Sequence, residues 1–175
     1  MKTFSLVLFM LSFLSLGAQT EAPSSPNWYT FDQAVELNKK EPRPVIIDLY
    51  TDWCGWCKVM DQRTFSNPHI ATYLNTHFYP VKFDAEQAEK VNFKGRDYVF
   101  VAQGRRGYHE LAAALTGGQL SYPTLVFLDK DMNLLQPLPG FKGPNDLEPI
   151  MKFFGSGAYL SQSYEEFMQN FKSEL

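Results

Sequence analysis

A near-continuous apolar run from Val45 to Thr51, followed closely by two cysteines, constrains the fold more than any other feature of the chain. Only Asp48 interrupts the run, so we expect a central β-strand that is buried on both faces. Cys54 and Cys57 come directly after it, at the predicted start of a helix that runs to about Arg63. A buried strand that leads straight into a helix indicates an α/β domain.

Cys54 and Cys57 are the only cysteines among the 175 residues. A structural disulfide normally closes a long loop, whereas two intervening residues close almost none. At a helix N-terminus, however, the helix dipole stabilises a thiolate on the first cysteine. The spacing therefore predicts thiol–disulfide exchange, with Cys54 as the exposed attacking thiol and Cys57 as the buried resolving thiol.

Residues 1–18 have the pattern of a signal peptide. Lys2 precedes a stretch of apolar residues and serines, Phe4 to Leu16, and the small residues Gly17 and Ala18 follow. The stretch is shorter than the roughly 20 residues that a membrane span needs. We expect a short flexible leader at 19–27 and one folded domain at 28–175. The mature protein would be periplasmic or secreted, without a stable membrane anchor.

The rest of the chain predicts a mixed central sheet flanked by helices, because a strand–helix–strand unit is followed by an antiparallel hairpin. Thr30 with Gln33, and Ser163 with Glu166, fit helix capping boxes. Pro149 would lie near the first turn of its helix. The expected helices are 31–38, 67–76, 145–154 and an extra C-terminal helix at about 163–175, and the expected strands are 78–83, 124–128 and 134–138.

Residues 85–120 are predicted to be an insertion. We expect a hairpin of 91–93 with 98–101, and a helix from Tyr108 to Leu115. Lys94, Arg96, Arg105 and Arg106 make the insertion locally basic in a chain of net charge −3. A docking surface and a solvated hairpin both fit this pattern. The small net charge gives no strong field for nucleic acid.

The stretch from Val45 to Lys58 resembles the active-site strand and helix of the thioredoxin superfamily. It is most similar to the C-terminal thioredoxin-like domain of the bacterial transmembrane thiol-disulfide interchange reductase, which also has a segment like Thr64 to Pro68. Ser121 to Thr124 resembles the cis-proline loop of the superfamily. The resemblance implies a thioredoxin-like α/β fold with the insertion placed before the cis-proline strand.

The resemblance also implies roles for individual residues. Asp48 matches the buried acid that moves the proton of Cys57, although an Asp that only pairs with backbone is an alternative. Asp61 matches a second acid, with a plain solvated helix residue as the alternative. Trp53 matches the tryptophan beside the disulfide, where a core aromatic would also fit.

The predicted cis-proline is Pro123, which together with Tyr122 would offer backbone groups to an extended substrate; a trans proline is the alternative. Trp56, which is also a predicted substrate-side residue, stands where thioredoxins have proline. Many thioredoxins also have a lysine near the buried acid on the next strand, and the alignment puts Pro80 at that position.

No metal or cofactor is expected. The three histidines have no ligand spacing, and Lys58 after the pair excludes the covalent haem signature. We expect an exported enzyme that reduces disulfides in exported proteins, with electrons from a thiol donor such as a membrane reductase. A reductant is favoured because Trp56 carries no positive charge and Asp48, Asp52 and Asp61 disfavour a thiolate on Cys54.

Four alternatives stay open at this point. They are a disulfide oxidase or isomerase, a redox-inert binding module, a soft-metal thiolate site, and residence in the endoplasmic-reticulum lumen, since Lys172 to Leu175 resembles a retention signal.

Overall fold

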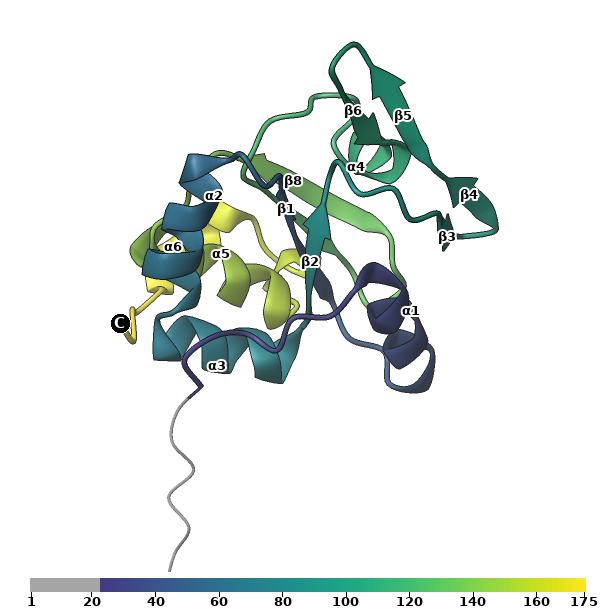
Figure 1. The fold of residues 1–175 in the computed structure, drawn as a ribbon. Helices are drawn as coiled ribbons and strands as arrows, with labels where there is room; N and C mark the ends of the chain where they lie inside the picture. Colours follow the sequence, from purple (N-terminus) through teal and green to yellow (C-terminus); the bar gives the residue numbers. More distant parts are fainter. Residues whose placement is uncertain (1–22) are drawn as a thin grey trace, which may run out of the picture.

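The computed structural model describes residues 23–175 (Figure 1). The predicted signal peptide lies outside the described residues. Within the predicted leader, Pro26 is buried, and the backbone N–H of Asn27 donates to Asn75 Oδ1 (2.6 Å). The folded domain therefore begins before residue 28, because Pro26 packs against it and Asn27 hydrogen-bonds to it.

A four-stranded mixed sheet forms the centre, in the order β2-β1-β7-β8. Strand β1 pairs in parallel with β2, whereas β7 runs antiparallel to β1 and β8. The two central strands, β1 and β7, are almost wholly buried, and for β1 this confirms the prediction from its near-continuous apolar run. The strands are β1 (Val45–Tyr50), β2 (Tyr79–Asp84), β7 (Thr124–Leu128) and β8 (Leu134–Pro139).

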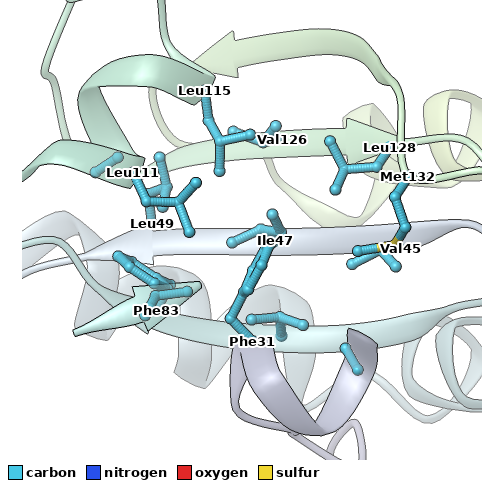
Figure 2. Packing of buried hydrophobic residues seen from close by; sticks show 14 of the residues in the cluster. Phe31, Val45, Ile47, Leu49, Phe83, Leu111, Leu115, Val126, Leu128 and Met132 are labelled. Atoms are coloured by element: carbon cyan, nitrogen blue, oxygen red, sulfur yellow. The ribbon is translucent and has the colours of Figure 1, made fainter. Parts of the chain in front are cut away.

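Helices cover both faces of this sheet, and β1 supplies alternate side chains to each face. Ile47 and Leu49 pack with Phe31 of α1 (Phe31–Lys40) and Leu111 of α4 (Glu110–Leu115), as Figure 2 shows. Ile46 packs on the opposite face, against α2 (Gly55–Met60), a π-helical turn (Asp61–Phe65), α3 (Pro68–His77) and α5 (Pro144–Gly155). Since side chains alternate along a strand, Asp48 lies on the same face as Ile46, beneath α2.

The C-terminal region packs against α5. After a 3-10 turn (Ala158–Leu160), α6 spans Tyr164–Asn170 and is shorter than the predicted 163–175. Beyond α6, the carboxylate of Glu148 accepts from Ser173 Oγ (2.5 Å) and the N–H of Glu174 (2.8 Å), so the tail follows α5 instead of continuing the helix. Pro149 lies in the middle of α5 and not in its first turn.

The insertion consists of two hairpins and α4. Its strands are β3 (Val91–Phe93), β4 (Arg96–Tyr98), β5 (Phe100–Gln103) and β6 (Arg106–His109). The hairpin around Lys94 is present, but its second strand is 96–98 and not the predicted 98–101, because Phe100 and Val101 belong to β5 and pair with β6. The predicted helical start at Tyr108 is wrong. Tyr108 belongs to β6 and pairs with Val101 of β5, and His109 is the N-cap of α4. In Figure 1 the hairpins extend outward from the end of the sheet where β2 ends.

Candidate active site

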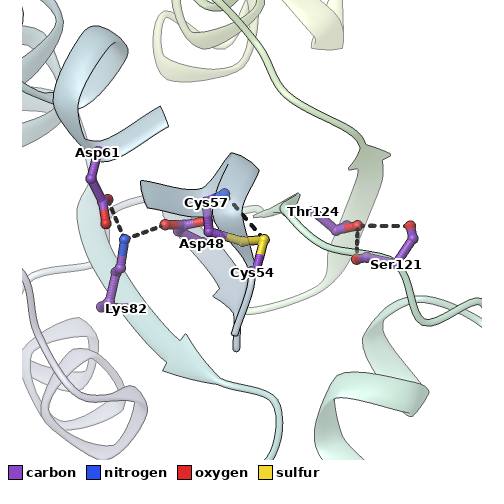
Figure 3. The surroundings of a disulfide bond; sticks show 7 residues. All are labelled: Asp48, Cys54, Cys57, Asp61, Lys82, Ser121 and Thr124. Atoms are coloured by element: carbon purple, nitrogen blue, oxygen red, sulfur yellow. Dashed lines mark hydrogen bonds and ion pairs between the residues drawn. A yellow bond between two sulfur atoms is a disulfide. The ribbon is translucent and has the colours of Figure 1, made fainter. Parts of the chain in front are cut away.

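Cys54 and Cys57 form a disulfide at the junction between β1 and α2 (Figure 3). Cys54 is the N-cap of α2, and its Sγ accepts a hydrogen bond from the backbone N–H of Cys57 (3.1 Å). The first N–H groups of a helix have no partner within the helix and stabilise negative charge. The helix start therefore favours a thiolate on Cys54 once the disulfide is reduced.

The expectation of an exposed Cys54 is wrong for the disulfide-bonded form. Cys54 is 4% exposed and Cys57 is 2% exposed. The Sγ of Cys54 is bonded back to Cys57, so it faces the helix start and not the solvent. The exposed surface here belongs instead to the neighbouring indoles, with Trp53 51% and Trp56 61% exposed. The two indoles therefore form the solvent-facing surface beside the buried disulfide.

Asp48 is a fully buried carboxylate on β1. Its Oδ2 accepts a hydrogen bond from Lys82 Nζ (2.6 Å), while its Oδ1 has no hydrogen-bond partner among residues 23–175. Burial raises the pKa of Asp48 to about 6, and the charge of Lys82 opposes this rise. In Figure 3 the carboxylate is joined to Lys82 on one side and is drawn beside Cys57 on the other. The result is a carboxyl group that can take or release a proton near neutral pH.

Lys82, and not Pro80, is the residue of β2 that faces Asp48. The parallel register pairs Asp48 with Lys82 and Ile46 with Pro80. The alignment from sequence was therefore displaced by two residues. A displacement of two leaves every side chain on its expected face of the sheet, so the apolar pattern did not reveal the error. The lysine that many thioredoxins have beside the buried acid is therefore present as Lys82, and the predicted departure at Pro80 is wrong.

Lys82 is held from several sides. Its Nζ also contacts Asp61 Oδ1, on the π-helical turn after α2. The rings of Trp28, Tyr50 and Phe65 surround it, with centroids 5.1, 5.1 and 5.5 Å from Nζ. Burial acts to lower the pKa of Lys82, but Asp48 and Asp61 outweigh it and raise that pKa overall.

Asp61, singled out from sequence as a second acid, thus joins the site through Lys82. Its carboxylate is 42% exposed, in contrast to the buried carboxylate of Asp48. The cluster of Asp48, Lys82 and Asp61 therefore reaches from the buried strand to the solvent. The π-helical turn that carries Asp61 is the kind of local irregularity that occurs often at functional sites.

The loop before β7 forms the other side of the site. The peptide bond between Tyr122 and Pro123 is cis. Burial raises the pKa of Tyr122 to about 12, so its hydroxyl stays protonated at physiological pH. Trp56, Tyr122, Pro123, Gly140 and Phe141 line a hollow of about 260 Å³. Gly140 and Phe141 were not predicted from sequence, because only the β7–β8 pairing brings them beside the loop.

Two further observations concern metal binding and membranes. No cluster of three or more His, Cys, Asp or Glu side chains suited to a metal ion occurs within residues 23–175. His109 is buried where β6 meets α4, and its ring nitrogens bond to backbone groups of Glu89 and Leu111. Among the described helices, none has the length and apolar character needed to cross a membrane.

Comparison with known proteins gives a consistent result. The chain is 27% identical over 130 residues to the uncharacterized protein B0495.5 of Caenorhabditis elegans, covering 73% of the chain but 16% of that protein. It is 39% identical over 61 residues to the thiol:disulfide interchange protein DsbD of Pectobacterium atrosepticum, covering 33% of the chain and 10% of DsbD. The chain thus spans a small part of these relatives. A solved structure titled DsbH oxidoreductase superposes with a TM-score of 0.55 at 19% identity, covering 83% of the chain and 95% of that structure.

A family model completes the comparison. The model described as "Thioredox_DsbH: Protein of unknown function, DUF255" matches residues 15–139. This range includes all four strands of the central sheet, the disulfide and the whole insertion. The chain therefore belongs to this thioredoxin-like family, and its Cys54–Cys57 disulfide lies within the matched range.

Proposed function

We propose that the protein is an exported reductase that uses the Cys54–Cys57 dithiol to reduce disulfides in exported proteins. The observation that carries this proposal is the weak support for a thiolate on Cys54. The hydrogen bond that its Sγ accepts within residues 23–175 comes from one backbone N–H, that of Cys57. A strong oxidant needs an unusually stable thiolate on the first cysteine. Here Trp56 and the acidic residues nearby do not supply that stability.

The reduced enzyme would act in two exchange steps. The Cys54 thiolate attacks a substrate disulfide, forms a mixed disulfide and releases one substrate thiolate, which takes a proton from water. Asp48 accepts the proton of Cys57 through its unpartnered Oδ1. The Cys57 thiolate then attacks Cys54 Sγ and releases the second substrate thiolate, which also takes a proton from water. Two electrons pass from the enzyme dithiol to the substrate, and the enzyme is left in the disulfide form described above.

A thiol donor must then return two electrons to the Cys54–Cys57 disulfide. The similarity to the interchange protein DsbD supports a relay in which the donor is a thiol protein, such as a membrane reductase. The predicted signal peptide at 1–18 supports a periplasmic or secreted location. Every step uses sulfur chemistry alone, so the proposal requires no metal or organic cofactor.

Insulin reduction by the mature protein, with dithiothreitol as donor, tests the proposal. We expect turnover above that of dithiothreitol alone, and loss of this turnover in Cys54→Ser. Glu174→Gln serves as the control, because this exposed residue lies on the C-terminal tail. Absence of turnover by the folded wild-type protein would contradict the reductase proposal and favour the binding-module alternative.

A further inference from the structure

The insertion reaches the active site through Arg106. The guanidinium carbon of Arg106, at the start of β6, lies 4.2 Å from the ring centroid of Trp53, the residue before Cys54. A cation over an indole face at this distance is attracted by the ring's electron distribution. The β5–β6 hairpin, residues 100–109, therefore contributes directly to the surface beside the redox pair.

Trp53 is half exposed and yet contacted from three directions. Besides Arg106, its Nε1 donates to Glu86 Oε2 (3.1 Å), and the ring of Tyr122 meets it edge-on at 5.9 Å. Glu86 follows β2, and Tyr122 belongs to the cis-proline loop. The insertion thus contacts the indole both at its beginning, through Glu86, and at its second hairpin, through Arg106.

The position of Arg106 is fixed by the hairpin that carries it. A Cβ at Gly107 would lie 2.3 Å from the ring of Phe100 and 2.4 Å from the carbonyl oxygen of Val101, so β5 and β6 approach too closely for any other residue. At the far end of β6, the N–H of His109 donates to Ala85 O (2.6 Å). The hairpin is therefore anchored to the domain just after β2.

Arg106 has no competing partner that would explain its placement. Across residues 23–175 its guanidinium forms no ion pair within 4.0 Å, unlike the ion-paired Arg43 or Lys152. Its described contact is the face of the indole. The planar guanidinium suits this stacking better than a flexible ammonium group does.

We propose that Arg106 is a positioning residue that holds Trp53 as one wall of a docking surface for polypeptide disulfides. Trp56 and Phe141, whose rings lie 5.5 Å apart, form the other wall and line the hollow described above. The Tyr122–Pro123 loop joins the two walls, because Tyr122 contacts Trp53 and also lines the hollow. A polypeptide that brings its disulfide to Cys54 contacts both walls, whereas a small disulfide needs only the sulfur. This inference rests on the proposed reductase function and adds the residue that positions the surface for its polypeptide substrates.

The test compares two substrates and three variants. We expect Arg106→Ala to lower the rate constant for insulin reduction about two- to fivefold, the size of one exposed cation–π contact. The rate constant for hydroxyethyl disulfide should stay unchanged, as should the redox potential. Arg105→Ala is the matched control, because it removes the same charge from the adjacent exposed position and should leave both rate constants unchanged. Arg106→Lys should restore part of the loss.

Fluorine NMR of fluorotryptophan-labelled protein supplies a second readout that does not depend on activity. Arg106→Ala should shift the Trp53 resonance, assigned with Trp53→Phe, and Arg105→Ala should not. Equal losses on both substrates, equal effects of the two alanine variants, or an unmoved Trp53 resonance would each overturn the inference. If the wild-type protein reduces neither substrate, the proposed function fails instead, and the Trp53 resonance still decides whether Arg106 holds the indole.

Discussion

Lys82 Nζ lies 2.6 Å from Asp48 Oδ2 across the parallel strands β1 and β2, which places a buried ion pair on the same face of the sheet as the helix that carries Cys57. The lysine neutralises one oxygen of the carboxylate and leaves the other without a partner among the described residues. Burial and ion pairing act on the pKa of Asp48 in opposite directions, and burial has the larger effect. The pair therefore accounts for a carboxyl group that titrates near neutrality.

The two cysteines should differ in their ability to trap substrate. Cys57→Ser should accumulate mixed disulfides on Cys54, because the resolving thiol is missing, and Cys54→Ser should form none. Non-reducing electrophoresis followed by mass spectrometry measures both. Equal trapping by the two variants would refute the division of labour.

Asp48→Asn should change how stability depends on pH. The folded pKa of about 6 exceeds the ordinary value of 3.8, so the native state holds a proton that the unfolded chain releases between these values. Wild-type stability should therefore fall as pH rises from about 4 to 7. Two pKa units correspond to about 3 kcal/mol. This fall should be absent in Asp48→Asn, as measured by urea unfolding across the pH range.

The same variant should slow the second exchange step, because the proton acceptor for Cys57 is lost. The rate of release from a preformed mixed disulfide should fall while the fold is kept. Glu165→Gln, which alters an exposed carboxylate on α6, provides the control. Identical release rates for Asp48→Asn and wild type from pH 6 to 9 would exclude Asp48 from the mechanism.

Lys82→Met should destabilise the protein more than the removal of both members of the ion pair does. It leaves Asp48 buried without its cation, and removal of one partner of a buried pair typically costs about 3–5 kcal/mol. The loss should be greatest at high pH, where Asp48 is charged. The double variant Asp48→Asn with Lys82→Met should recover most of the stability. A double variant as unstable as Lys82→Met alone would argue against the ion pair as the cause.

His109 should give stability the opposite pH dependence. Burial lowers the pKa of its imidazole below 6.5, and Nδ1 accepts from the N–H of Leu111. As pH falls below about 6.5, the unfolded chain takes up a proton that the native ring refuses, so stability is lost. In the Asp48→Asn background, His109→Gln should flatten this decline between pH 7 and 5. His69→Gln, on the exposed surface of α3, should leave it unchanged.

Local patterns were sufficient to predict the elements that carry the redox pair. The apolar run of β1 predicts a doubly buried strand whatever surrounds it, and the cysteines at the following helix start identify the chemistry. The capping boxes at Thr30 and Ser163 are equally local and are confirmed. Each of these features depends on residues within a few positions of one another.

The remaining features depend on contacts between distant segments. The partner of Asp48 depends on the register between the parallel strands β1 and β2. A register shifted by two residues gives the same apolar pattern, so the pattern does not distinguish Lys82 from Pro80. The β5–β6 hairpin depends on the close approach of Phe100 to Gly107. The contact between Arg106 and Trp53 joins two segments that carry no common motif, so only the folded structure brings it to light.

The redox potential of the Cys54–Cys57 pair tests the central claim most directly. A thiolate stabilised by one helix N-terminus, without a basic side chain between the cysteines, predicts a potential near that of thioredoxin, about −270 mV. Equilibration of the purified protein with glutathione buffers of graded composition, read by thiol alkylation and mass spectrometry, gives the value. A potential near −270 mV supports a reductant, and a potential above about −180 mV, the range of isomerases and oxidases, would contradict it.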